Sequence, residues 1–163
     1  MKIYFASDHA GFELKKTLVA FVRDELKYEA EDCGPFEFDA DDDYPVFVSG
    51  AVRKLADALQ AGEDAFAIVL GASGQGEAMV ANRFKGIRAA VFYGPRGFQT
   101  DAIHRTMTML EATRIHNNAN VLSLGARFLT PDEACQAVRT WLATPFPGEN
   151  RHVRRIKEID SLV

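Results

Sequence analysis

Cysteine is scarce in this sequence, and its scarcity argues against two kinds of chemistry. Only two cysteines occur among 163 residues, Cys33 and Cys135, and neither belongs to a C-x-x-C motif or has a partner at ligand-like spacing. A disulfide framework or a cysteine-based metal site needs more numerous or more closely spaced cysteines. We therefore expect two reduced thiols in the protein core and assign them no chemical role.

Long apolar runs and an excess of positive charge are also missing. Apolar stretches such as "AFAIVL" at 65–70 are too short to span a bilayer, and an acidic residue comes too early for a secretory signal. The net charge of −4 argues against nucleic acid or a membrane surface as a partner. A composition of 47% hydrophobic and 26% charged residues suits one compact domain over 1–163. We expect a cytoplasmic protein.

Short β-rich runs alternate with amphipathic helical patterns along the chain, without internal repeats. This alternation predicts a parallel sheet with helices on both faces, a Rossmann-like three-layer α/β/α fold with about five strands. The expected strands are 2–7, 28–33, 65–70, 86–94 and 120–125. The expected helices are 11–26, a helix from Pro45 to about Ala61, 77–84, 130–144 and a basic C-terminal helix at about 148–163. The acidic run "DADDDYP" at 39–45 is interpreted as a solvated loop.

The stretch "GASGQGEAMVAN", 71–82, places three glycines between a strand and a helix. It should lie at the carboxyl edge of the sheet, where α/β folds bind ligands and where glycines let backbone N–H groups approach an anion. The alternatives are a tight turn without a ligand and a dinucleotide site. The strand at 86–94 ends without the acidic residue that would hold a ribose, and no Lys-Ser or Lys-Thr follows the glycines as in a P-loop.

Glu77 follows the last glycine directly. A carboxylate in the first turn of the helix would compete with a bound phosphate, whereas beside N–H donors it suits a base working next to a developing oxyanion. A carboxylate that only complements the helix dipole is the simpler alternative. Position in the sequence does not separate the two.

Further candidate residues stand near strand ends and in the tail. Asp8 and His9 follow the first strand, although an N-cap and a surface imidazole would explain them equally. His116 and Asn117 precede the last strand, and Arg127 follows it. Arg151 and Arg155 are four residues apart, so one helical face can present both to a phosphate or to solvent.

Six motifs together resemble one family. They are "SDHAGFELK", "DYP", "GxSGxGE…AN", "GIRAA", "HNNANVLSLGAR" and "RHVRRI", in the order and approximate spacing of type B ribose-5-phosphate isomerases and galactose-6-phosphate isomerase subunits. The match covers nearly the whole chain. The resemblance implies an aldose–ketose isomerase that works through an enediolate without cofactor or metal.

The resemblance also implies roles for individual residues. Many members carry a cysteine base at the position of Gly71, so this chain is similar to the subgroup in which the glutamate, here Glu77, is the base. His116 would open the sugar ring, and Asp8 and Asn117 would order hydroxyl groups. Backbone N–H groups of Ser73 to Gly76 would form the oxyanion hole. The substrate-binding set implied in this way is Asp8, His9, Ala72, Ser73, Gly74, Gln75, Gly76, Asn117, Arg127, Arg151 and Arg155, with His9 and the three arginines on the phosphate.

Family members are at least dimers whose subunits complete each other's sites, so we expect a homodimer or homotetramer with the C-terminal helix reaching a partner. One segment, Pro95 to Thr113, looks longer than in the family. Ile103, Met107 and Leu110 recur there at helical spacing, which predicts a turn followed by a short amphipathic helix that leaves Arg96, Asp101, His104 or Arg105 to face a ligand. We expect this segment to set substrate choice; an inserted scaffold helix is the alternative.

Ribose 5-phosphate is the expected substrate. The alternatives are a tetrose or hexose phosphate and, in another class, a non-catalytic module that binds sugar phosphates or nucleotides. Such a module would give Glu77 and His116 no task.

Overall fold

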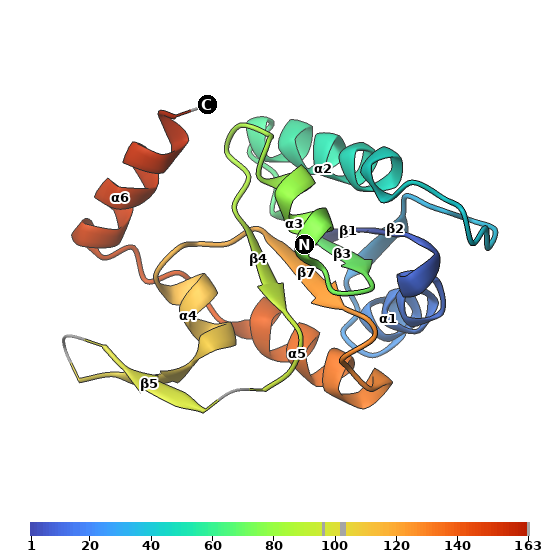
Figure 1. The fold of residues 1–163 in the computed structure, drawn as a ribbon. Coiled ribbons are helices and arrows are strands. Elements are labelled where there is room, and N and C mark those ends of the chain that lie inside the picture. Colours follow the sequence, from blue (N-terminus) through green and yellow to red (C-terminus); the bar gives the residue numbers. More distant parts are fainter. Residues whose placement is uncertain (96, 102–103, 163) are drawn as a thin grey trace.

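A five-stranded parallel sheet forms the centre of the computed structural model, which describes residues 1–95, 97–101 and 104–162. The strand order is β2–β1–β3–β7–β4 (Figure 1). The strands are β1 (Lys2–Ser7), β2 (Glu29–Asp32), β3 (Ala65–Gly71), β4 (Ala89–Phe92) and β7 (Val121–Gly125). The predicted three-layer α/β/α fold is confirmed, although β4 covers only the middle of the strand expected at 86–94.

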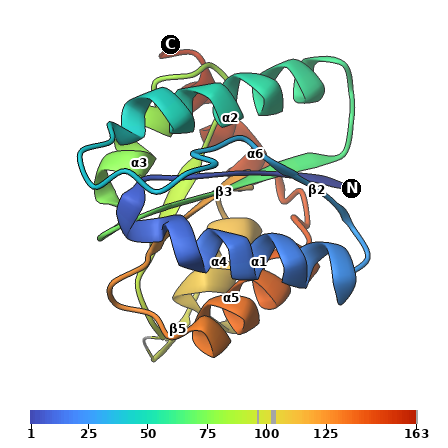
Figure 2. The same ribbon diagram turned by 90° about the vertical axis from the view of Figure 1, so that its right-hand side faces the viewer.

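Helices cover both faces of the sheet because alternate strand residues are apolar on each side. On one face Ile68 and Leu70 pack with α1 (Phe12–Asp24) and α5 (Pro131–Ala143). On the other, Ala67 and Val69 pack with α2 (Tyr44–Gln60) and α3 (Gln75–Ala81). Figure 2 shows α2 and α3 on the opposite side of the sheet from α1 and α5. Within the described ranges, no helix is both long and apolar enough to cross a membrane.

Several helices begin close to the predicted residues, because capping residues and prolines fix their first turns. Thr130 caps α5 through its side chain, which accepts a hydrogen bond from the Glu133 N–H, and Pro131 opens the helix. Pro45 lies in the first turn of α2. The basic tail forms α6 (Asn150–Asp160), as expected. A 3-10 turn, η1 (His9–Gly11), links β1 to α1.

The segment after β4 differs from its prediction. A two-stranded antiparallel hairpin, β5 (Phe98–Thr100) and β6 (Thr106–Thr108), precedes α4 (Met109–Ile115). Threonines at both ends of the pairing favour strand because they are β-branched. The helix starts only at Met109, because Thr108 and Glu111 form a capping box. Met107 therefore lies buried on a strand, whereas Arg96 and Ile103 fall outside the described residues.

The loop between β2 and α2 is fixed at its start by a buried cation. The Lys15 side chain is fully buried, and its Nζ donates to Asp32 Oδ1 at 2.5 Å and to the Pro35 carbonyl at 2.7 Å. A buried ammonium requires such partners, because its desolvation is otherwise very costly. The contact ties α1 to the end of β2.

We expect Asp32→Ala to lower the free energy of unfolding by roughly 3 kcal/mol, because it leaves the Lys15 charge buried with one partner fewer. Glu13→Ala, which removes the exposed Glu13–Lys16 pair, serves as the control and should cost less than about 1 kcal/mol. Urea unfolding followed by circular dichroism measures both changes. Equal losses for the two variants would show that the buried pair has no special weight.

Candidate active site

The carboxyl ends of β1, β3 and β7 meet at one edge of the sheet. Ser7 pairs with Leu70, and Gly71 pairs with Gly125. The loops that follow are joined by backbone hydrogen bonds, from Ala126 N–H to the Gly71 carbonyl at 2.8 Å and from Arg127 N–H to the Ala72 carbonyl at 3.1 Å. This edge, called the glycine-loop edge below, therefore collects residues from three separate stretches of sequence.

The glycine loop is held in a conformation that other residues would not easily adopt. Gly74, the N-cap of α3, has φ 76°, in the left-handed region, and its carbonyl accepts a hydrogen bond from Ser123 Oγ at 2.6 Å. A Cβ on Gly76 would lie 2.6 Å from the Tyr44 hydroxyl oxygen. The chain thus packs closely here, and the backbone of Ser73 to Gly76 forms the turn into α3 and its first residues.

Glu77 lies over the bare backbone of Gly71. Glu77 is only 4% exposed. A Cβ built on Gly71 would come within 1.9 Å of Glu77 Oε1. The carboxylate therefore fills the space that a side chain at position 71 would occupy. Burial raises the pKa of Glu77, and the nearby Asp8 carboxylate adds to the rise.

Asp8, whose charge acts on the Glu77 carboxylate, is followed directly by His9. Asp8 caps η1 by accepting the Gly11 N–H at 3.1 Å, as the simpler reading of the sequence proposed. His9 Nδ1 lies 2.8 Å from Asp42 Oδ1 in the acidic run. That hydrogen bond raises the pKa of His9, while the charge of nearby Arg127 opposes the rise. The interpretation of the acidic run as a merely solvated loop is therefore wrong for Asp42.

A second cluster surrounds His116, the C-cap residue of α4. Its ring stacks on that of His152 in α6, with centroids 4.6 Å apart and planes at 16°. Asp101, at the end of β5, places Oδ2 3.7 Å from His116 Nε2 and 3.8 Å from Arg151 Nη2. We call these four residues the His116 cluster.

His152 accepts a hydrogen bond at Nε2 from Arg151 Nε at 3.1 Å, which requires that nitrogen to be unprotonated. Burial lowers the pKa of His152, and the charges of His116 and Arg151 lower it further. Glu149 links the hairpin to α6, since it forms ion pairs with both Arg105 and Arg151. His116 is thus held between a neutral ring and a carboxylate.

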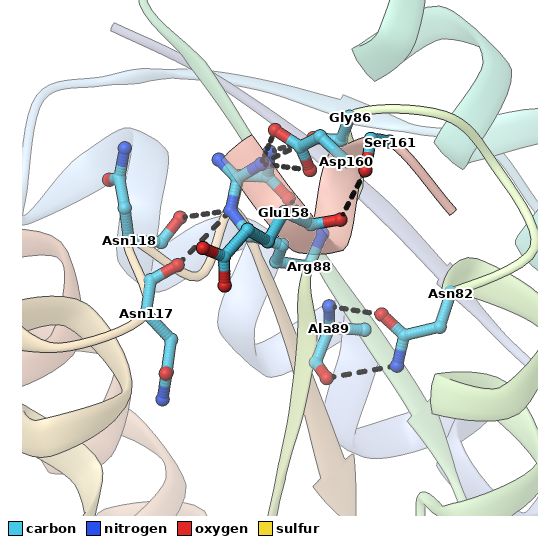
Figure 3. A network of polar contacts seen from close by, with 10 residues as sticks. Asn82, Gly86, Arg88, Ala89, Asn117, Asn118, Glu158, Asp160 and Ser161 are labelled. Atoms are coloured by element: carbon cyan, nitrogen blue, oxygen red, sulfur yellow. Dashed lines mark hydrogen bonds and ion pairs between the residues drawn. The ribbon is translucent and has the colours of Figure 1, made fainter. Parts of the chain in front are cut away.

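Asn117 follows His116 in a turn that is organised by Arg88. Arg88 Nε donates to the carbonyls of Asn117 at 3.1 Å and Asn118 at 3.2 Å, and its Nη1 lies 3.2 Å from Asp160 Oδ1 (Figure 3). The C-terminal end of α6 is therefore tied to the same turn. Arg155 lies exposed one helical turn after Arg151.

The residues of the glycine-loop edge and the His116 cluster lie at opposite ends of the strands. His116 precedes the start of β7, whereas Gly125 ends it, and five residues of strand span about 16 Å. Figure 1 shows α6 far from the end of β1 and from α1. One chain therefore brings together Asp8, His9, Ala72, Ser73, Gly74, Gln75, Gly76, Glu77 and Arg127, and separately His116, Asn117, Arg151 and Arg155.

The sequence did not mark two residues of these sites, Asp42 and His152, as candidates. Asp42 was hidden in a run of carboxylates, and no local pattern marks it as the partner of a histidine 33 positions away. His152 was noticed only as part of a basic tail. Tyr44, from the "DYP" motif, contacts Gly76. Among the described residues, no group of three or more His, Cys, Asp or Glu could hold a metal ion.

Known proteins resemble this chain over almost its full length. Residues 3–159 match the Ribose/Galactose Isomerase family. Ribose-5-phosphate isomerase B of Mycolicibacterium paratuberculosis is 38% identical over 157 residues, which cover 96% of this chain and 87% of that protein. The putative sugar phosphate isomerase YwlF of Bacillus subtilis is 33% identical, over 98% of this chain and 95% of that protein.

Solved structures agree with this likeness. Ribose-5-phosphate isomerase B of Mycoplasma genitalium, with bound ribulose 5-phosphate, has a TM-score of 0.83 and 33% identity, covering 99% of this chain and 95% of that one. The enzyme of Thermotoga maritima has a TM-score of 0.81 and 38% identity, covering 98% and 97%. The protein therefore belongs to the ribose/galactose isomerase family and is an aldose–ketose isomerase.

Proposed function

We propose that the protein interconverts ribose 5-phosphate and ribulose 5-phosphate, with Glu77 as the base. The observation that carries this proposal is the buried Glu77 carboxylate, which lies over Gly71 beside the backbone of the glycine loop. The ribulose 5-phosphate bound to the Mycoplasma genitalium relative supports the choice of substrate.

The reaction needs one group that moves a proton between neighbouring carbons. In the open-chain aldose, Glu77 takes the proton from C2 while the C1 carbonyl oxygen becomes the enediolate oxyanion. The same carboxyl group returns the proton to C1, and the proton of the C2 hydroxyl passes to the C1 oxygen, which leaves a ketone at C2. A raised pKa makes Glu77 a stronger base than an exposed glutamate.

Backbone donors of the glycine loop would stabilise the oxyanion. The turn that Gly74 makes directs N–H groups of Ser73 to Gly76 around the start of α3, where the first N–H groups of a helix lack partners within the helix. Asp8 would order a sugar hydroxyl from the end of β1. The hydrogen bond from Ser123 Oγ to the Gly74 carbonyl holds this loop against β7.

The remaining groups would come from the His116 cluster and from its neighbours Asn117 and Arg155. His116 would open the furanose ring and Asn117 would order a hydroxyl, while Arg151 and Arg155 would join His9 and Arg127 on the phosphate. Because the two edges of one sheet are about 16 Å apart, a single chain does not offer all of these groups to one sugar. We therefore propose a homodimer or homotetramer in which His116 of the partner subunit completes the site.

Another sugar phosphate is the second candidate substrate, because the hairpin lies in the segment that looks longer than in the family and contacts the proposed ring-opening residue. The β5–β6 hairpin reaches the His116 cluster through Asp101, whose side chain is 4% exposed. The hairpin would thereby influence which sugar fits, by fixing His116 and Arg151 rather than by the ligand-facing helix that the sequence suggested. A purely binding module is disfavoured, because it would gain nothing from a buried carboxylate that is costly to ionise.

Glu77→Gln should lower kcat for ribose 5-phosphate by roughly 10²- to 10⁴-fold, because the amide keeps the shape of the side chain but accepts no proton. Substrate binding should stay within about tenfold. A coupled ketose assay and calorimetric binding measure the two quantities.

Gly71→Ala tests the same carboxylate without changing it. The new Cβ would displace Glu77 Oε1 from its position 1.9 Å away, so activity should fall while Glu77 remains present. Gly50→Ala is the matched control, because nothing lies within 4 Å of a Cβ at that position. Near-normal turnover of both Glu77→Gln and Gly71→Ala would leave Glu77 as a helix-dipole residue only.

A mixing experiment tests the shared site. Glu77→Gln and His116→Ala should each be inactive alone, but mixed dimers would contain one site with an intact Glu77 and an intact His116. A statistical mixture should recover about a quarter of the wild-type activity. Native mass spectrometry shows whether the subunits have exchanged. If they have and the isomerase activity still does not recover, both residues of a working site belong to one chain.

Replacing residues 96–107 by a short Gly/Ser bridge should change the ranking of four-, five- and six-carbon phosphates by kcat/KM. Proton exchange that depends on Glu77 should persist on at least one of them. The bridge leaves Thr108 and its capping box in place, so α4 is retained. An unchanged ranking in a folded variant would identify the hairpin as scaffold.

A further inference from the structure

Asp42 is the one carboxylate of the acidic run for which the structure records a hydrogen bond to a proposed substrate-binding residue. Its side chain is 4% exposed, and Oδ1 accepts both the His9 backbone N–H at 3.0 Å and the Nδ1–H at 2.8 Å. Asp41, its neighbour, is exposed. Burying a carboxylate is costly without such bonds, so the two donors of His9 stabilise this path of the loop.

This pair fixes the direction of the imidazole. The two nitrogens of the ring point in widely different directions, so a bond that holds Nδ1 also sets where Nε2 points. The side chain of His9 makes its hydrogen bond to the described residues through Nδ1, to Asp42. The ring of Phe38 lies nearly perpendicular to the imidazole, with centroids 6.5 Å apart.

The charges around His9 come from three elements. Asp8 precedes η1, Asp42 belongs to the loop before α2, and Arg127 follows β7. Asp42 is the largest cause of the raised pKa of His9, while partial burial and Arg127 oppose it. Asp42 Oδ2 is buried without a hydrogen-bond partner among the described residues, which leaves negative charge beside the ring.

We propose that Asp42 is a positioning residue for anion recognition, which orients His9 so that its Nε2–H faces the phosphate of the substrate beside Arg127. This assignment rests on the proposed function, in which His9 binds that phosphate. Asp42 itself does not touch the substrate. Asp42 favours the charged form of the His9 imidazole and fixes its direction, so that His9 can donate a hydrogen bond to an anion at the glycine-loop edge.

The pH dependence follows from the sign of the shift. A raised pKa keeps the imidazolium to higher pH, so anion affinity should be high below that pKa and fall as pH rises through it. Asp42→Asn removes the charge that favours the imidazolium. The fall in affinity should therefore occur at lower pH in the variant.

Inorganic sulfate is the probe, because its charge stays constant from pH 5.5 to about 9, unlike that of a phosphate ester with a pKa of about 6. The full-length protein is titrated calorimetrically over this range as wild type, Asp42→Asn and the control Asp41→Asn. Near neutral pH, Asp42→Asn should bind sulfate about tenfold more weakly, with a smaller difference at pH 5.5. Asp41→Asn should follow the wild type, although it removes the same charge from the same loop.

NMR titration of the His9 ring in the wild type supplies a readout that does not depend on the folding of a variant. The ring should titrate above about 6.5, with its proton on Nδ1 in the neutral form. Kinetics should show KM for the sugar phosphate rising in Asp42→Asn while kcat changes little. A wild-type ring that titrates below 6.5, or equal sulfate affinities for Asp42→Asn and Asp41→Asn, would overturn the assignment.

Failure of the proposed function looks different. A wild type that does not isomerise ribose 5-phosphate, but whose sulfate binding weakens in Asp42→Asn, keeps the Asp42–His9 pair and loses only the substrate. A wild type that isomerises ribose 5-phosphate while Asp42→Asn leaves sulfate affinity and the His9 titration unchanged loses the Asp42 role alone.

Discussion

Parallel pairing of β3 with β1 on one side and β7 on the other is the constraint on which the candidate site depends. Because parallel strands end at the same edge, Asp8, the glycine loop and Arg127 meet there although they come from distant parts of the chain. Backbone hydrogen bonds between the loops after β3 and β7 then fix their relative height. Helices on both faces shield the central strands, so the candidate-site residues lie where these strands end.

The relation between Gly71 and Glu77 explains why a carboxylate can serve where other family members are expected to use a thiol. The space above residue 71 holds one reactive group, and here it is filled by Oε1 of a residue six positions later. A side chain at position 71 would occupy the same space as the Glu77 carboxylate, so the two cannot be present together. Burial in the same space raises the pKa of the Glu77 carboxylate. The packing of Glu77 over Gly71 therefore sets both the position and the basicity of the proposed base.

The His116 cluster is held together by contacts between segments that are separate in the sequence. It draws on three elements that meet beyond the other edge of the sheet, namely the hairpin, the end of α4 and the start of α6. Glu149 and Asp101 join the hairpin to α6, and Arg88 joins the far end of α6 to the turn after His116. The helix is therefore held at both ends, which presents Arg151 and Arg155 on a fixed surface, in keeping with a role toward a second subunit.

The sequence alone was enough to predict the strands, most of the helices and the glycine loop, because apolar periodicity and glycine, proline and cap residues act over a few neighbouring positions. It also identified Glu77, Asp8 and His9 as candidates. Tertiary structure alone decided that Asp42 is buried against His9, that Asp101 lies beside His116 and that the two clusters stand at opposite edges. The Asp42 contact joins residues 33 positions apart. No local pattern encodes such a contact, since its energy depends on which charges the fold buries together.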